Sequence, residues 1–290
     1  PPTAPNQISE MEIPVIVPEA GRVYLKVYYT LKTGDSFRKA GHPLGFDEIS
    51  LTNADSRNQI SLNREKQADE SKKKLPKLKV SETARYIIVE GASFKYVYSK
   101  LKGVFEQLSV AGKEILEKPM EVNIWRAPTD NDMYIKLEWM KAMYDRAAAR
   151  AYTTKYSQDA EAVTIHTTMS VGAVTVQRIL SIDAVWIIDN SGMISVKMDV
   201  SKNVELPELP RFGLRMFLPD KMKQVTYFGL GPEESYEDKR RASSHGMYCQ
   251  SVSELHEDYI KPQENGSHAD CDYVMLEGNG VVVKAFNNDK

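Results

Sequence analysis

The sequence predicts an all-β protein, with a small β-sandwich, a charged linker and then a large antiparallel β-sandwich that carries one helix. Three observations favour this fold class. Apolar and polar side chains alternate with a period of two along many short segments, and residues typical of turns separate these segments. One segment shows the spacing of three and four residues that is typical of a helix. With 290 residues, the chain is long enough for about two domains.

The first domain is predicted within residues 1–63. Residues 22–29 alternate between two sets of side chains, which is typical of a half-buried antiparallel strand. A turn signal follows at residues 32–35, and residues 46–51 predict a second strand. So few short strands indicate a small and partial sandwich.

A charged linker is predicted over residues 64–80. Ten of these seventeen residues are charged, seven basic and three acidic. Such a run cannot bury enough apolar surface to offset the entropy lost on ordering. It also lacks interleaved aromatic residues, which argues against a nucleic-acid patch.

The large sandwich is predicted from residue 81 onward. Its clearest strand covers residues 163–171, where apolar side chains occupy every second position. Residues 189–192 read Asp-Asn-Ser-Gly and predict a hairpin turn. The other predicted strands are residues 94–98, 174–182, 184–189, 193–200, 214–218, 225–228 and 281–286.

One helix is predicted over residues 136–151. Leu137, Met140, Tyr144, Ala147 and Ala151 recur at three or four residues. The alanine-rich end has a high helix propensity.

Composition excludes several classes of protein. Lys and Arg number 38 against 40 for Asp and Glu, so the net charge is −2 and predicts no nucleic-acid partner. No apolar run approaches the 18 or so residues of a membrane span, so no membrane partner is predicted. Two cysteines, Cys249 and Cys271, are too few for a disulfide scaffold.

Two loop motifs begin like known ligand sites. Residues 229–234 begin like a phosphate-binding glycine loop, but Glu234 stands where the last glycine belongs. We therefore expect a tight turn after a strand that ends at Phe228, with Pro232 opening a new element. Residues 130–132 begin like a calcium loop, but Ile135 occupies the position of its required glycine.

Two histidine–cysteine pairs, His245 with Cys249 and His268 with Cys271, offer the donor atoms that zinc takes. Neither pair has the spacing of a zinc motif, so no metal site is predicted. We expect a buried thiol and partly exposed histidines, and the sequence leaves open whether the four side chains meet in space.

Three strings resemble the C-terminal small-chain domain of glycoside hydrolase family 2 β-galactosidases. They are residues 125–132 (WRAPTDND), residues 227–236 (YFGLGPEESY, followed by Asp238 and Lys239) and residues 259–266 (YIKPQENG). Their order and rough spacing agree with that family. Residues 40–46 are similar to a stretch of the immunoglobulin-like domain that precedes the small-chain domain.

The resemblance implies a domain organisation. These enzymes are retaining β-glycosidases of five domains, with two catalytic glutamates and a magnesium ion on a central TIM barrel. The fourth domain is immunoglobulin-like, and the fifth is a supersandwich related to galactose mutarotases. Residues 1–63 would then be part of the fourth domain, and residues 81–290 a C-terminally truncated fifth domain. We expect an internal fragment with no catalytic residue and no cofactor of its own, inactive on a nitrophenyl galactoside.

The resemblance also marks candidate site residues. A carbohydrate-binding or pocket-rim role is expected for Arg126, Asp130, Asn131, Asp132, Glu264 and Asn265. A structural role is expected for Gly229, Gly231, Pro232, Glu233, Tyr236 and Asp238. The alternative for the first set is a self-satisfied turn, in which Asp and Asn cap a helix that begins near Tyr134.

The implied function is that of the non-catalytic portion of a β-galactosidase. Its partners would be the β-galactoside substrate, the other domains of the same chain and further copies in a homo-oligomer. Two alternatives stay open: a family 2 glycosidase with another sugar specificity, and a stand-alone carbohydrate-binding or epimerase-like sandwich. The latter would use His245 or His256 with Glu264 as its acid–base pair. Location in the bacterial cytoplasm or periplasm also stays open.

Overall fold

The computed structural model of the chain describes residues 3–18, 22–51 and 76–287. The chain divides into two compact units, one formed by residues 1–72 with 288–290 and the other by residues 73–287. Within the described residues, no helix is long and apolar enough to cross a membrane.

The smaller unit contains a β-hairpin. Strands β1 (Tyr24–Thr30) and β2 (Pro43–Ser50) pair antiparallel, so both strands predicted from the sequence are present. The turn between them is closed by two backbone bonds, from Leu31 N to His42 O (2.8 Å) and from Gly41 N to Leu31 O (2.7 Å). Residues 52–63 lie outside the described part, so an immunoglobulin-like sandwich stays a prediction.

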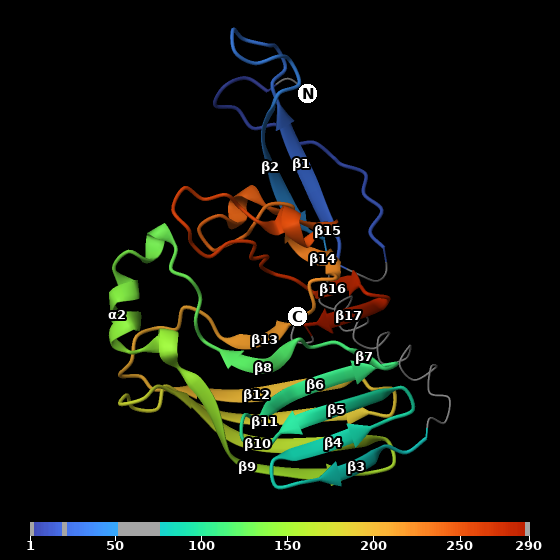
Figure 1. The fold of residues 1–290 in the computed structure, drawn as a ribbon. Helices are drawn as coiled ribbons and strands as arrows, with labels where there is room; N and C mark the ends of the chain where they lie inside the picture. The colour runs from blue at the N-terminus through green and yellow to red at the C-terminus, as the bar shows by residue number, and fades with distance from the viewer. Residues whose placement is uncertain (1–2, 19–21, 52–75, 288–290) are drawn as a thin grey trace. The chain divides into compact units, whose positions relative to one another are not determined.

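The larger unit contains two antiparallel sheets that stack face to face (Figure 1). The five-stranded sheet has the order β3-β4-β5-β6-β7 and the four-stranded sheet the order β12-β11-β10-β9. The strands of the first are β3 (Lys79–Glu82), β4 (Tyr86–Glu90), β5 (Phe94–Ser99), β6 (Val104–Val110) and β7 (Lys113–Glu114). Those of the second are β9 (Ala148–Gln158), β10 (Ala162–Gly172), β11 (Leu180–Asp189) and β12 (Ile194–Lys202).

Aromatic side chains from both sheets meet in the core. Trp186 of β11 is 1% exposed, and its ring lies 6.0 Å from that of Tyr98 and 5.2 Å from that of Phe105, edge to face in both cases. Every second residue from 180 to 188 is buried. Because side chains alternate between the faces of a strand, the period of two seen in the sequence places these residues between the sheets.

Two further sheets complete the unit. Strands β8 (Lys118–Asn123) and β13 (Gly213–Phe217) pair antiparallel. The last sheet has the order β15-β14-β16-β17, with β14 (Met222–Gly231), β15 (Ser244–Ser251), β16 (Tyr273–Gly278) and β17 (Val281–Phe286).

Among the described residues, α2 (Ile135–Lys141) is the one α-helix. Four short 3₁₀ turns accompany it: η1 (Asp130–Asp132), η2 (Tyr144–Arg146), η3 (Arg240–Ala242) and η4 (Val252–Leu255). The prediction of an all-β fold with one helix is confirmed.

Several predicted boundaries differ from the structure, three of them by many residues. The helix ends at Lys141 because Met143 adopts a left-handed conformation (φ 55°), and the alanines from Ala148 onward pair with β10 instead. Pairing with a neighbouring strand here outweighs the helix propensity of alanine. The strand predicted over 174–182 begins only at Leu180. Leu78 is 4% exposed and β3 begins at Lys79, so the linker predicted over 64–80 ends earlier, and its residues 64–75 lie outside the described part.

Candidate functional site

The first of the three strings forms a turn held by a partly buried ion pair. Arg126 donates two hydrogen bonds to Asp132, from Nη1 to Oδ2 (2.5 Å) and from Nη2 to Oδ1 (3.1 Å). The side chains are 14% and 11% exposed. Arg126 Nε donates to the carbonyl of Pro210 (3.1 Å), which ties the turn to the segment that leads into β13. Such bidentate pairs are strong and fix both side chains in one geometry.

Asp132 also caps its own turn. Its Oδ2 accepts hydrogen bonds from the backbone N–H of Thr129 (2.7 Å) and from the Thr129 hydroxyl (3.0 Å). Burial alone would raise the pKa of Asp132, but the hydrogen bonds from Arg126 and Thr129 outweigh it and lower the pKa. The expected capping of α2 is wrong, since that helix begins after Tyr134, which forms no side-chain cap. The Asp132 carboxylate binds Arg126 and the start of η1 instead.

The third string lies against the first. Glu264 Oε2 accepts a hydrogen bond from Ala127 N (3.2 Å), and its Oε1 is bound by Arg211 (2.5 Å). Gln263 Oε1 accepts from Asp130 N (2.9 Å). The side chains of Gln263 and Glu264 therefore join the third string to the first, and Ala127 and Glu264 are 137 positions apart in the sequence. Asn265 takes another role, because its Nδ2 faces the carbonyls of Glu257 and Gln263 within its own loop (3.5 Å each).

The second string completes the arrangement. Glu234 is buried with 5% of its side chain exposed, and its carboxylate binds Lys239 and the Tyr259 hydroxyl. Its Oε2 accepts from Gly266 N (2.9 Å). Asn131 donates to Asp238, so the second string also contacts the first. We call residues 125–132, 231–239 and 259–267 the loop cluster.

Tyr236 lies between two cations of the loop cluster. Its ring is 5.9 Å from the Arg126 guanidinium and 5.9 Å from the Lys239 ammonium. Burial raises the pKa of its hydroxyl. Pro232 and Glu233 are exposed in the same string.

Three carboxylates of the cluster, those of Asp132, Glu234 and Glu264, bind cations at close range. Asp130 is 69% exposed and stands 3.8 Å from Lys261.

The glycines of the second string lie inside a strand. The tight turn predicted after Phe228 is wrong, because β14 continues through Gly229 to Gly231 and pairs with β15. A Cβ at Gly229 would overlap the Cys271 sulfur and stand 3.0 Å from its Cα, and one at Gly231 would overlap the Tyr227 hydroxyl. Close packing, and not a turn, requires glycine at these positions.

Replacing Gly229 with alanine should lower the free energy of unfolding by about 1–3 kcal/mol, because the Cys271 backbone blocks the new methyl group. Gly213→Ala is the matched control, since a Cβ there meets nothing within 4 Å; its effect should stay within about 0.5 kcal/mol. Urea denaturation of both variants measures the difference. Equal losses in the two would show that the contact with Cys271 is unimportant.

The two histidine–cysteine pairs form no shared metal site. His245 binds Asp270 (2.7 Å). The expected buried thiol is not found, because Cys249 is exposed and Cys271 is only partly buried. No group of three or more His, Cys, Asp or Glu side chains among the described residues is placed to hold a metal ion. His256 lies near Asp258 (3.3 Å) at the surface.

His268 is partly buried beside the ring of Tyr227, with 4.2 Å between ring centroids. Its Nδ1 lies 3.1 Å from the carbonyl of Leu230, to which it donates a hydrogen bond. Burial lowers the pKa of His268. The half-buried thiol of Cys271 faces the carbonyl of His268 (3.5 Å).

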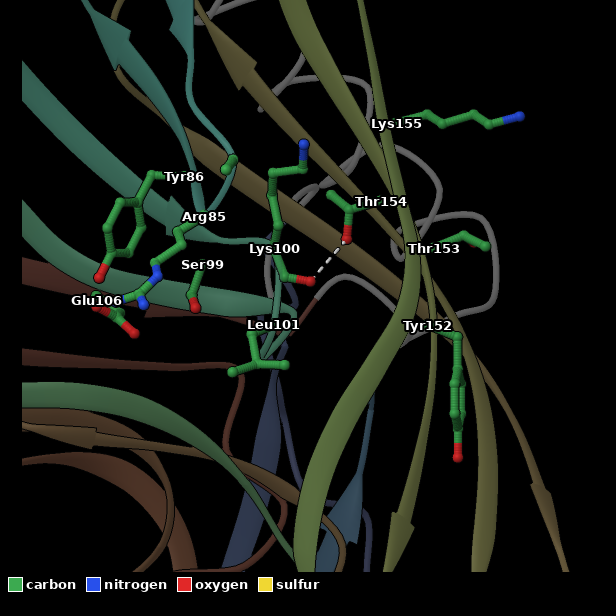
Figure 2. A pocket seen from close by; sticks show the side chains of 11 residues that line it. Arg85, Tyr86, Ser99, Lys100, Leu101, Glu106, Tyr152, Thr153, Thr154 and Lys155 are labelled. Carbon is green, nitrogen blue, oxygen red and sulfur yellow. Dashed lines mark hydrogen bonds between the residues drawn. The ribbon is translucent and has the colours of Figure 1, made fainter.

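A pocket of about 790 Å³ opens beside β9, at the turns that join β3 to β4 and β5 to β6 (Figure 2). The turn between β5 and β6 is fixed to β9 by hydrogen bonds from Thr154 Oγ1 to Lys100 O (3.3 Å) and from Ala151 N to Leu101 O (2.8 Å). The residues that line the pocket include Ser99, which is 3% exposed. Sequence reasoning missed this pocket, because none of its residues belongs to a recognisable motif.

Sequence reasoning also missed the residues that join the loops. Arg211 and Gln263 bind across long sequence separations, and no local pattern marks Arg211. Lys239 and Tyr259 belong to the strings that carried the resemblance, and they contact each other in the loop cluster.

Comparison with known proteins identifies the family. Residues 90–289 match the family described as β-galactosidase small chain. A β-galactosidase of Actinobacillus pleuropneumoniae is 37% identical over 278 residues, which cover 93% of this chain and 26% of that protein. One of Staphylococcus xylosus is 31% identical over 90% of this chain and 25% of the relative, and one of Kluyveromyces lactis 29% identical over 73% and 21%. The chain spans about a quarter of the length of these relatives. The chain belongs to the β-galactosidase small chain family.

Proposed function

We propose that this chain is the non-catalytic, sandwich-built portion of a β-galactosidase. One observation carries the proposal: nearly the whole chain matches the relatives, whereas it spans only about a quarter of their length. The glutamates that cleave terminal β-D-galactosides with retention, and any magnesium ion beside them, would then lie on other polypeptide. Assembly of the intact protein into homo-oligomers stays a prediction.

The loop cluster would supply a rigid rim for the sugar pocket or for contacts with other domains. Three of its carboxylates are held by Arg126, Arg211 and Lys239, so the loops are ordered before any ligand arrives. Asp130 and Asn131 stay exposed at the surface of this arrangement. Carboxylate and amide groups on a pre-ordered loop suit sugar hydroxyls and inter-domain hydrogen bonds equally well.

An exchange of segments tests the proposal. The matching segment of the Actinobacillus pleuropneumoniae β-galactosidase is replaced by this chain, which is 37% identical to it. We expect the chimera to hydrolyse a nitrophenyl β-galactoside, and this chain alone to show no turnover. Turnover by the purified chain alone, or a folded chimera without activity, would contradict the proposal.

Two controls make the result specific. The relative without its matching segment should be inactive, which shows that the activity depends on the exchanged part. Titration of the isolated chain with galactose, followed by NMR, tests the stand-alone sugar-binding alternative, which saturable binding would support.

A further inference from the structure

The chain contains two Asn-Gly pairs, Asn265-Gly266 and Asn279-Gly280. Asparagine before glycine is prone to deamidation, because the glycine nitrogen can attack the asparagine side-chain carbon and no side chain on the glycine blocks the approach. The structure gives the two pairs opposite surroundings. The first lies in the loop cluster beside a buried carboxylate, and the second forms the exposed turn between β16 and β17.

Asn279 and Gly280 are the two residues of the turn that joins β16 to β17. Gly278 pairs with Val281 on either side of them, and φ is 52° at Asn279 and 66° at Gly280, as in a type I′ turn. Both turn residues are exposed. No acceptor among the described residues takes a hydrogen bond from the Gly280 N–H, which lies outside the ladder of the two strands. The nitrogen that would attack is therefore accessible.

Lys113 of β7 binds this turn. Its ammonium donates to the carbonyl oxygens of Asn279 (2.8 Å) and Gly280 (3.2 Å). The Asn279 carbonyl and the Gly280 nitrogen belong to one peptide group, so the negative charge of the deprotonated nitrogen spreads onto this oxygen. That anion is the nucleophile of deamidation. A cation held at the oxygen stabilises the charge where it develops, so Lys113 is placed to promote the attack.

Glu234 has the opposite effect on the other pair. Its carboxylate accepts a hydrogen bond from Gly266 N (2.9 Å), and only 5% of its side chain is exposed. A buried carboxylate at this distance stabilises the protonated amide and disfavours the anion that attack requires. Asn265 is also partly buried. The Asn265-Gly266 pair is therefore protected by the same contact that orders the loop cluster.

We propose that Asn279 is a deamidation site that Lys113 promotes, whereas Glu234 protects Asn265 from the same reaction. The Gly280 nitrogen loses its proton and bonds to Cγ of Asn279, the bond from Cγ to Nδ2 breaks, and ammonia leaves with that proton. Water then opens the succinimide ring at either carbonyl and gives aspartate or isoaspartate. The reaction adds a carboxylate beside Lys113, and isoaspartate also lengthens the main chain inside the turn that sets the register of β16 and β17.

The test follows both asparagines in the purified chain. The folded chain is kept at mildly alkaline pH and then digested under acidic conditions, and peptide mass spectrometry measures the exchange of amide for carboxyl at each site. Asn279 should convert about tenfold faster than Asn265 or more, because hydrogen bonds to charged groups favour the anion at one site and oppose it at the other.

Three variants examine the role of Lys113. Lys113→Ala should slow the conversion of Asn279 about threefold or more and leave that of Asn265 unchanged. Lys113→Arg keeps the charge and should retain most of the rate. Lys155→Ala is the matched control, since it removes an exposed lysine of β9, a strand that does not pair with β16 or β17. An Asn279 rate that Lys113→Ala leaves unchanged, or that Lys155→Ala lowers equally, would overturn this role.

Denatured chain separates the effect of the fold from that of the local sequence. In urea neither Lys113 nor Glu234 is held at its site, so Asn279 and Asn265 should convert at similar rates. Equal rates in the folded chain would overturn the proposal. So would a difference that persists in urea, because it would then come from the neighbouring residues in the sequence and not from the two contacts.

Discussion

Replacing Asp132 with alanine should lower the free energy of unfolding of the larger unit by about 3 kcal/mol, the lower end of the range for a buried ion pair broken on one side. The substitution leaves the guanidinium of Arg126, whose side chain is 14% exposed, without its bidentate partner. It also removes the acceptor of two hydrogen bonds from Thr129. Urea denaturation of the full chain measures the loss.

Two further variants show whether the loss belongs to this pair. Asp130→Ala, two residues away and 69% exposed, should change the free energy of unfolding by no more than about 0.5 kcal/mol. Arg126→Met combined with Asp132→Ala should cost less than the sum of the two single changes, because the pair is then removed together. A strictly additive double variant would contradict a direct coupling between them.

The effect of Asp132→Ala should also depend on pH. The pKa of Asp132 is lowered from its ordinary 3.8, because the hydrogen bonds from Arg126 and Thr129 outweigh burial. A carboxylate with a depressed pKa stabilises the fold fully above the pKa of the unfolded state, and this stabilisation is lost as the pH falls through the folded pKa. The difference between the unsubstituted chain and the variant should be constant near neutral pH and shrink below about pH 4. A constant difference down to pH 2 would contradict the assignment.

One strand was predictable because one of its faces is buried and the other is not, whereas β4, with the same kind of burial pattern, was not predicted. Residues 163–171 alternate strictly, and β10 has the expected boundaries to within a residue. The alanine-rich segment after residue 147 was predicted as helix because alanine has no side-chain pattern to contradict its propensity. Its pairing with β10 depends on contacts with residues far along the chain, which no local window contains.

The candidate site was predictable in its strings but not in its contacts. Arg126 and Asp132 lie six residues apart, and their types alone allow an ion pair. That Glu264 would bind Arg211 depends on how β13 and the last loop meet, which is a property of the fold. Gly229 and Gly231 were predicted to form a turn for a related reason, because a glycine that permits close packing and a glycine that makes a turn look the same in a sequence.

Replacing Trp186 with alanine should have the largest effect on stability, a loss of about 3–5 kcal/mol in the free energy of unfolding. Trp186 is 1% exposed and packs edge to face against Tyr98 and Phe105 of the opposite sheet, so the variant leaves a cavity between the two layers. Ile187→Ala is the matched control, since Ile187 is the next residue of β11, points to the other face and is 41% exposed. It should cost less than about 1 kcal/mol. If urea denaturation gave similar losses for both, the two sheets would not share the core that these contacts define, and the sandwich could not act as the scaffold that the proposed function requires.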